Sequence, residues 1–266
     1  MTAGAEALKP SLVDGLVSIL SPHGVYEKSE GNVRQEEGLT NATGLLWGAE
    51  PPRFIEIQEH GCRFLIDPRG GQKTGFFLDQ RENRRLVYDL ATNKTVLNGF
   101  AYTGGFGIFA AMGSAKHVVS VESSNSAQRL ARKNWNLNHL QEQQGTFLQE
   151  DMFSYIRKAP QSFDLIVLDP PPFVRRRQDV STGMKGYKEI NIQAFRNLAP
   201  GGHLLTFSCS QHVSAQDFRQ IVLFAATDAK RQVQLLKHLG PAVDHPLNFF
   251  HSEGAYLKGL WLRMGD

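Results

Sequence analysis

A proline-rich turn carries the first residue that could react with a substrate. The apolar stretch 163–168 runs directly into Asp169, Pro170, Pro171, Pro172 and Phe173. Proline fixes φ and removes an N–H donor, so such a turn holds the Asp169 carboxyl and its neighbouring carbonyl groups in place. The flat ring of Phe173 can stack on a base. A turn of this composition can arise by chance, but its place after a predicted strand favours a functional role.

Cys209 is the second reactive candidate, because it follows the predicted strand 204–207. A lone Cys usually packs as a small apolar side chain. A thiolate, however, can add to C6 of cytosine and make C5 a carbon nucleophile. Asp169, protonated or sharing a proton, would lower the barrier by hydrogen bonding to N3. We therefore predict Cys209 and Asp169 as the catalytic pair and assign Cys62 to structure.

A glycine-rich loop, 98–107, follows the first strand of the main repeating pattern. Glycine lets the backbone turn sharply and approach a ligand closely. Taken alone, such a loop is often only a tight turn. Its spacing does not fit G-x-G-x-x-G, and the chain contains no G-x-x-x-x-G-K-[ST], so a phosphate-binding P-loop is excluded.

Two carboxylates fall where a nucleoside needs them. Glu122 ends the strand 118–121 and can accept hydrogen bonds from both ribose hydroxyls. Asp151 follows the strand 147–148, where it could bind the adenine amino group or simply cap the next helix. Loop and carboxylates together predict an adenosine cofactor without pyrophosphate, the pattern of S-adenosylmethionine. The other predicted cofactor contacts are Asn98, Gly99, Phe100, Tyr102, Thr103, Gly104, Ser123, Met152 and Asp169.

Basic side chains follow the proline-rich turn. Arg175, Arg176 and Arg177 come directly after it, and Lys185 comes soon afterwards. A basic run is usually a solvated face, but this one borders the predicted active site, where it would bind RNA phosphates independently of sequence. The predicted substrate contacts are these four residues together with Pro170, Pro171 and Phe173.

The elements that position these residues alternate between short apolar runs and helical stretches. Strands are predicted at 96–97, 118–121, 147–148, 165–168, 204–207, 233–236 and 257–262. Helices are predicted at 107–112, 126–138, 152–156, 187–198 and 215–227. This order indicates an α/β fold of the Rossmann-like kind, with a seven-stranded, mostly parallel sheet covered by helices on both faces. Such sheets bind ligands beyond the carboxyl ends of their strands.

The part of the chain before this pattern predicts a small N-terminal segment. Residues 1–50 suggest one short helix, at 12–20, and a loop-rich lead-in. Residues 53–58 and 62–66 flank Glu59-His60-Gly61 and predict a β-hairpin, followed by a short extended piece at 73–78 and a helix at 80–91. We therefore expect a lead-in at 1–50, a small α+β extension at 51–92 and the Rossmann-like domain at 93–266.

Composition sets wider limits. The 266 residues are 41% hydrophobic and 21% charged, with a net charge of +3, which is typical of a soluble globular protein. Neither a signal peptide nor an apolar run of the ~20 residues that cross a bilayer is present, so a cytoplasmic setting with two reduced cysteines is expected. The histidines show no metal-ligand spacing, and no metal is predicted.

Several motifs in this order resemble one bacterial family. They are the segment from Gln72 to Arg84, the Asn-x-Phe-x-Tyr-Thr-Gly-Gly-Phe loop, Asp-Pro-Pro-x-Phe-Val, Leu-Thr-Phe-Ser-Cys-Ser, Asp244-His-Pro246 and the segment from Glu253 to Gly259. Over residues 50–266 the chain is similar to the RlmI family, which methylates C5 of cytosine in large-subunit (23S-type) rRNA.

The resemblance implies a class I methyltransferase fold with an antiparallel last hairpin, S-adenosylmethionine as cofactor, Cys209 as nucleophile, and Gln80 and Arg81 near the amino-acid moiety of the cofactor. Two departures stand out. Family members usually begin with an RNA-binding PUA domain, for which the first fifty residues are too short, so either the chain is a shorter form or it binds RNA differently. Pro172 stands where relatives mostly carry Lys.

Two other functions remain open. An rRNA methyltransferase acting on a guanine or adenine nitrogen would also use Asp-Pro-Pro-Phe, but those relatives lack a cysteine after the fifth strand. A catalytically silent RNA-binding or assembly factor is disfavoured by the presence of Glu122, Asp169 and Cys209. The sequence leaves the oligomeric state open, with a homodimer as one alternative.

Overall fold

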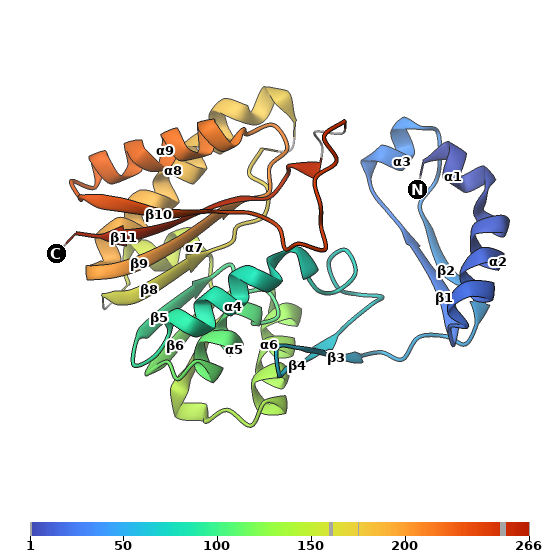
Figure 1. Cartoon of the computed structure of the whole chain (residues 1–266), viewed down its shortest axis with the longest axis horizontal. Helices are drawn as coiled ribbons and strands as arrows, with labels where there is room; N and C mark the ends of the chain where they lie inside the picture. Colours follow the sequence, from blue (N-terminus) through green and yellow to red (C-terminus); the bar gives the residue numbers. More distant parts are fainter. Residues whose placement is uncertain (1, 160–161, 175, 251–253, 266) are drawn as a thin grey trace. The chain divides into compact units, whose positions relative to one another are not determined.

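The main sheet of the structure has seven strands. The structure, a computed structural model, describes residues 2–159, 162–174, 176–250 and 254–265. The strand order is β10-β11-β9-β8-β5-β6-β7 (Figure 1). The bounds are β5 Thr95–Gly99, β6 His117–Val121, β7 Gly145–Leu148, β8 Phe163–Leu168, β9 Leu198–Ser208, β10 Val233–Leu239 and β11 Lys258–Met264. Strands β5 to β9 run parallel, whereas β11 runs antiparallel to both of its neighbours. The predicted mostly parallel, seven-stranded sheet is confirmed.

Helices cover both faces of this sheet. On one face α4 (Arg81–Leu90), α5 (Gly105–Met112) and α6 (Asn125–Leu137) pack side by side, and on the other α7 (Met152–Arg157), α8 (Val180–Asn197) and α9 (Ala215–Asp228) do so (Figure 1). Short 3-10 turns are η1 (Leu78–Gln80), η2 (Glu142–Gln144) and η3 (Arg177–Asp179). Strands covered on both faces need apolar side chains on both, which is why β8 is a continuous run of buried residues apart from Asp164.

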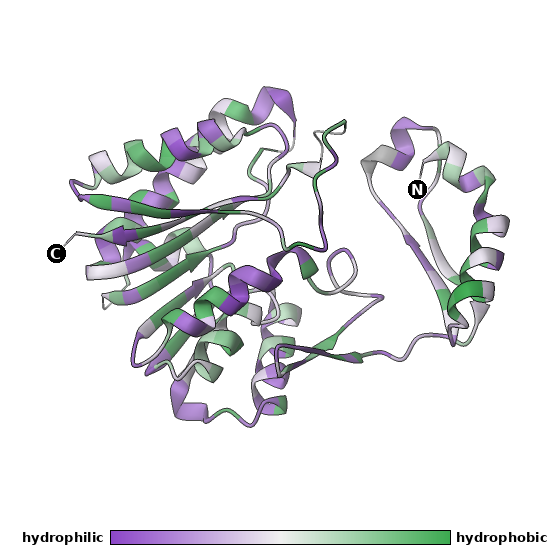
Figure 2. Cartoon of the chain, viewed as in Figure 1, coloured by the Kyte–Doolittle hydropathy of each residue, from purple (hydrophilic) through white to green (hydrophobic). Residues whose placement is uncertain are grey.

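The edges of the sheet differ from its centre. Figure 2 shows apolar residues along the central strands, and Val96, Leu97, Ile166 and Val167 are fully buried. By contrast β10, the edge strand, exposes most of its side chains, Lys237 among them. Charged side chains on an edge strand discourage pairing with another chain.

Helix α8 begins earlier than the sequence suggested. It starts at Val180, whereas the prediction placed it at 187–198. Gly183 and Gly186 made the first turns resemble a loop, but they serve packing. A Cβ at Gly183 would lie 2.3 Å from Val174 Cγ2 and 2.7 Å from the Phe173 carbonyl oxygen. The glycines therefore let α8 approach the turn that follows β8.

The predicted hairpin is confirmed as β3 (Ile55–Glu59) and β4 (Cys62–Ile66). Both residues of its turn, His60 and Gly61, have positive φ, as a two-residue hairpin loop requires. The amide side chains of Asn134, in α6, and Asn138, the residue that caps its C-terminus, bind the main chain of β4. Asn138 accepts from Arg63 N at 2.8 Å, and Asn134 accepts from Leu65 N at 2.7 Å. Because these amides lie one helical turn apart, they match alternate residues of the strand.

Residues before the hairpin form more structure than expected. The structure has α1 (Ala3–Ala7), α2 (Lys9–Leu20), β1 (Gly24–Ser29), α3 (Asn32–Glu36) and β2 (Ala42–Gly48) where mostly loop was predicted. β1 and β2 pair antiparallel. The extended piece expected at 73–78 is wrong, since turns occupy that stretch.

By their contacts the residues divide into two compact units, one of Met1–Glu56 and Ile66–Phe76, the other of Ile57–Leu65 and Phe77–Asp266. The domain bounds proposed from the sequence stay a prediction.

Ion pairs hold the smaller unit together. Lys9 Nζ lies 2.9 Å from Glu27 Oε2 and also binds Glu6, and Arg34 Nη1 lies 2.8 Å from Glu6 Oε2. Helix α2 buries none of its residues completely. Charged groups, among them the buried Glu27 and Arg34, therefore contribute to this unit where α2 offers no fully buried apolar face.

Candidate active site

The candidate site lies at the edge where the parallel strands end. Because β5 to β9 run in one direction, the loops after them share that edge. These loops carry Gly99 to Gly104, Glu122, Asp151, Asp169 and Cys209. The sheet thus collects at one edge the residues selected after each strand.

The loop after β5 has a strained backbone. Phe100, Tyr102 and Gly104 all adopt positive φ, at 57°, 46° and 88°. For residues with a side chain this conformation costs energy, and it occurs in tight turns and at functional sites. The loop also fixes Glu122, whose two carboxylate oxygens accept from Tyr102 N and Ser124 N, each at 2.8 Å. Each oxygen has a further lone pair, so Glu122 can still accept from a ligand's hydroxyls.

Other predicted cofactor residues support this loop. The Asn98 side chain is buried and donates to Ser120 Oγ at 3.4 Å, and the Thr103 carbonyl accepts from Asn134 at 3.1 Å. A Cβ at Gly99 would lie 2.8 Å from Met152 Sδ, so the strand end needs glycine to pack on α7. Ser123 is exposed next to Glu122.

Asp151 acts as the helix cap that the sequence left open. Its Oδ1 accepts from Ser154 N at 2.8 Å, at the first turn of α7. The residue is exposed. A contact with an adenine amino group is therefore an additional role for Asp151, and it stays a prediction.

The thiol and the proline-rich turn come together. Cys209 Sγ donates to the Pro170 carbonyl oxygen at 3.7 Å, and the side chain is only partly buried. The turn after β8 and the turn after β9 are adjacent because these strands are paired. The two predicted catalytic residues thus belong to one site.

Gln80 orients Asp169. Its amide Nε2 donates to Asp169 Oδ1 at 3.0 Å, and its own Oε1 accepts from Asn83 Nδ2 at 2.6 Å. Asn83 in turn also donates to the Gly240 carbonyl at 3.0 Å. Gln80 and Asn83 are both buried. This relay fixes one oxygen of the Asp169 carboxyl, a role for Gln80 that the sequence did not indicate.

Arg81 and its neighbours meet the segment after β10. Arg81 Nη1 pairs with Asp244 Oδ2 at 2.8 Å. A hydrogen bond from His245, with the charge of Arg81, lowers the pKa of Asp244. Tyr256 OH donates to Asp79 Oδ2 at 2.5 Å, while the buried Asp79 Oδ1 has no partner among the described residues. Three residues of this region, Asp79, Asn83 and Tyr256, were missed individually; only their motif segments pointed to them.

Phe173 packs in an aromatic cluster. Its ring centroid lies 4.7 Å from that of Tyr187, 5.6 Å from Phe153 and 6.1 Å from Phe100. The ring is partly buried. These contacts connect the reaction turn to the cofactor loop and to α8, and the remaining exposed part is what a substrate base could meet.

The basic residues near the turn are largely exposed. Arg176 and Arg177 lie at the start of η3, and Lys185 lies on α8. Arg175 falls outside the described residues. Lys188, by contrast, pairs with Asp228 at 2.7 Å. Arg176, Arg177 and Lys185 therefore present their charges to solvent.

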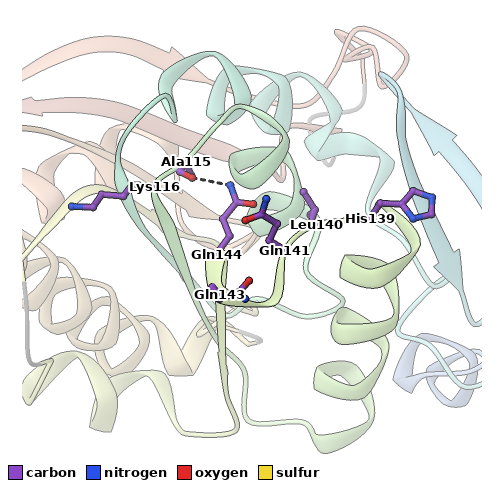
Figure 3. Close-up of a pocket in the computed structure, with 7 residues that line it drawn as sticks. All are labelled: Ala115, Lys116, His139, Leu140, Gln141, Gln143 and Gln144. Atoms are coloured by element: carbon purple, nitrogen blue, oxygen red, sulfur yellow. Dashed lines mark hydrogen bonds between the residues drawn. The ribbon is translucent and has the colours of Figure 1, made fainter.

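A pocket of about 480 Å³ lies elsewhere (Figure 3). Residues 115–116, 139–141 and 143–144 line it, directly before β6 and β7 begin. The amide of Gln144 there binds the carbonyls of Ala111 and Ala115. This is the amino end of the strands, opposite the site.

Among the described residues no cluster of metal ligands occurs, and no described helix is long and apolar enough to cross a membrane.

Comparison with known proteins identifies the family. The model of the S-adenosylmethionine-dependent methyltransferases matches residues 31–246. The chain belongs to this family. Ribosomal RNA large subunit methyltransferase I of Aeromonas salmonicida is 44% identical over 99% of this methyltransferase and 67% of the relative, and that of Aliivibrio fischeri ES114 is 42% identical with the same coverage.

A solved structure agrees in fold. A candidate methyltransferase complexed with SAH has a TM-score of 0.84 and 26% identity, covering 97% of this chain and 66% of that one. This methyltransferase thus spans about two thirds of the length of the relatives it matches. The strained loop after β5, the close packing at Gly99 and the oriented Glu122 carboxylate fit the S-adenosylmethionine that the family uses.

Proposed function

We propose that the enzyme methylates C5 of a cytosine in large-subunit ribosomal RNA through a covalent Cys209 adduct. The observation that carries this proposal is the contact between Cys209 Sγ and the Pro170 carbonyl, which joins the thiol to the Asp169 turn. The names of the relatives, ribosomal RNA large subunit methyltransferase I, support the substrate class. A methyltransferase acting on an exocyclic amine would need the turn but not a thiol beside it.

In the proposed reaction, Cys209 supplies the nucleophile and Asp169 acts on the ring nitrogen N3. The Cys209 thiolate forms a bond to C6, and the electron pair displaced from the C5–C6 double bond makes C5 nucleophilic. Asp169, protonated and held by Gln80, gives its proton to N3 as negative charge develops on the ring, and the Gln80 amide then stabilises the carboxylate that remains. S-adenosylmethionine, bound by the loop after β5 and by Glu122, supplies the methyl group. Loss of the C5 proton to water then re-forms the C5–C6 double bond, expels the Cys209 thiolate from C6 and lets N3 return its proton to Asp169.

RNA binding is assigned to the exposed cations beside the turn. Arg176, Arg177 and Lys185 can contact phosphates, which fixes the RNA without reading its bases. Phe173, with the rigid prolines 170 and 171, would hold the target base. Pro171 is exposed, whereas Pro170 is buried and contributes its carbonyl to the thiol.

Mass spectrometry of nucleosides tests the proposal. Ribosomal RNA is incubated with the enzyme and labelled S-adenosylmethionine, and 5-methylcytosine is the expected product. C209A should abolish the label while leaving cofactor binding by calorimetry intact, since the thiol touches the reaction turn and not the loop after β5. The matched control is C62A, in the hairpin. Labelled methylguanosine or methyladenosine, or full activity of C209A, would refute the proposal.

A further inference from the structure

One buried cation near Cys209 has no part in the reaction described so far. Lys258 begins β11, and its residue is only 7% exposed. Strand β11 runs antiparallel to β9, with Lys258 opposite Ser208. Its amine therefore arrives at the edge where Cys209 leaves β9. Lys258 Nζ donates to the Ser210 carbonyl oxygen at 2.6 Å.

Lys258 lacks the partner that a buried ammonium normally has. Among the described residues no carboxylate forms an ion pair with it, and its hydrogen bond goes to a main-chain carbonyl. Burial lowers the pKa of Lys258, and negative charge on Cys209 acts in the opposite direction. A buried cation without a carboxylate is costly to maintain. A sulfur that becomes an anion would offset that cost.

Two phenols close enough to Cys209 to feel its charge do not supply positive charge. Burial raises the pKa of Tyr187 on α8 and that of Tyr256 before β11, so both phenols stay neutral at physiological pH. The Asp169 carboxyl, on the neighbouring turn, would oppose a thiolate when ionised. Lys258, by contrast, is a buried cation that interacts with the sulfur.

The hydrogen bond alone does not explain a lysine. Ser210 is already held, because its Oγ accepts from Val174 N at 3.2 Å and bonds the Tyr187 hydroxyl at 2.9 Å. A neutral amide could donate to the Ser210 carbonyl equally well. What only a cation adds is charge at the turn that carries the nucleophile.

We propose that Lys258 is a positioning residue for the nucleophile, its buried ammonium stabilising the Cys209 thiolate while its bond to Ser210 fixes the turn after β9. This inference rests on the proposed function, which makes Cys209 the nucleophile, but the ionisation of the thiol can be measured without the methylation reaction. Lys258 binds the carbonyl of the residue that follows Cys209, and a nearby opposite charge favours the ionised form of a group. A low-pKa thiolate at neutral pH is what attack on cytosine C6 requires.

Alkylation of the full chain by iodoacetamide tests the inference without RNA. Rates are measured from pH 5 to 10, and peptide mass spectrometry separates Cys209 from Cys62. Burial raises the pKa of Cys62 to about 11, so it reacts slowly and serves as internal reference. We expect K258Q to raise the midpoint of Cys209 alkylation by about one pH unit, a roughly tenfold loss of thiolate below that midpoint.

Further variants make the result decisive. K258R should keep the midpoint of the unaltered enzyme, and K237Q, on the exposed edge strand, is the matched control. K258M offers a second neutral variant should K258Q not fold. An unchanged midpoint in the folded neutral variants would overturn the inference. A shifted midpoint together with an active C209A would uphold it and instead refute Cys209 as the methylation nucleophile.

Discussion

Replacing Gln80 separates two roles that its position allows. The resemblance to the RlmI family places Gln80 near the amino-acid part of the cofactor, whereas the structure bonds its amide to Asp169 at 3.0 Å. Q80M keeps the length of the side chain and removes the donor. The other donor of the relay, Asn83, keeps a partner in the Gly240 carbonyl. The change should therefore remove the hydrogen bond to the Asp169 carboxyl and the acceptor of the 2.6 Å bond from Asn83, while the bond from Asn83 to Gly240 remains.

The size of the effect follows from the kind of bond that is lost. A hydrogen bond to a charged group contributes about 1.5–3 kcal/mol, and the surroundings of Gln80 exclude water that could replace it. If the bond acts on the reacting state, kcat should fall by roughly 10- to 150-fold. Cofactor affinity should stay within about twofold if Gln80 acts only through Asp169.

Single-turnover methylation and calorimetric titration with S-adenosylmethionine are the two assays. L78M, at an exposed position of the same 3-10 turn, is the matched control and should change neither quantity. A Q80M enzyme with unchanged kcat and weakened cofactor binding would refute the relay. It would assign Gln80 to the cofactor instead.

Three further predictions concern stability and RNA binding. E59Q leaves the buried guanidinium of Arg84 without the carboxylate oxygens that it meets at 2.6 and 2.8 Å. Urea titration should show that the free energy of unfolding falls by about 3–5 kcal/mol, and the double variant E59L/R84M should recover most of it. Equal losses in the two variants would contradict this prediction. Burial lowers the pKa of His203 to about 4 from 6.5, so the unfolded chain takes up a proton first as the pH falls. The free energy of unfolding should decline between pH 6.5 and 4 less steeply in H203Q than in the unaltered protein, and parallel curves would be contrary evidence. R176Q and R177Q should each reduce the slope of log affinity for rRNA against log salt by about 1, and an unchanged slope would exclude phosphate contact.

The part of the site that depends on strand direction could be predicted from the sequence. Once the strands are taken as parallel, Glu122, Asp169 and Cys209 must lie at one edge, because each comes directly after a strand. The hairpin was predictable for a local reason, since His60-Gly61 supplies the positive φ of a two-residue turn.

Some elements that bury polar side chains were not predicted from the sequence. In β1 the buried side chains are Glu27 and Ser29, and Glu27 is bound by Lys9 from the preceding helix. A strand that buries charge shows no apolar alternation, so the pattern suggested a loop. The start of α8 failed for a related reason, because Gly183 is needed for contact with the turn and not to end a helix.

The last strand completes the site from the opposite direction. Strand β11 lies between β9 and β10, and its antiparallel course brings the residues just before it to the edge where the other strands end. There Tyr256 binds Asp79 and Lys258 binds the turn of Cys209. Asp79 and Lys258 are far apart in sequence, and only the family motifs that contain them pointed to either as part of the site. The segment after β10 also anchors Asn83, which binds Gln80, and Gln80 binds Asp169. Since β10 pairs with β11, the orientation of the Asp169 carboxyl depends on the same strand that completes the sheet.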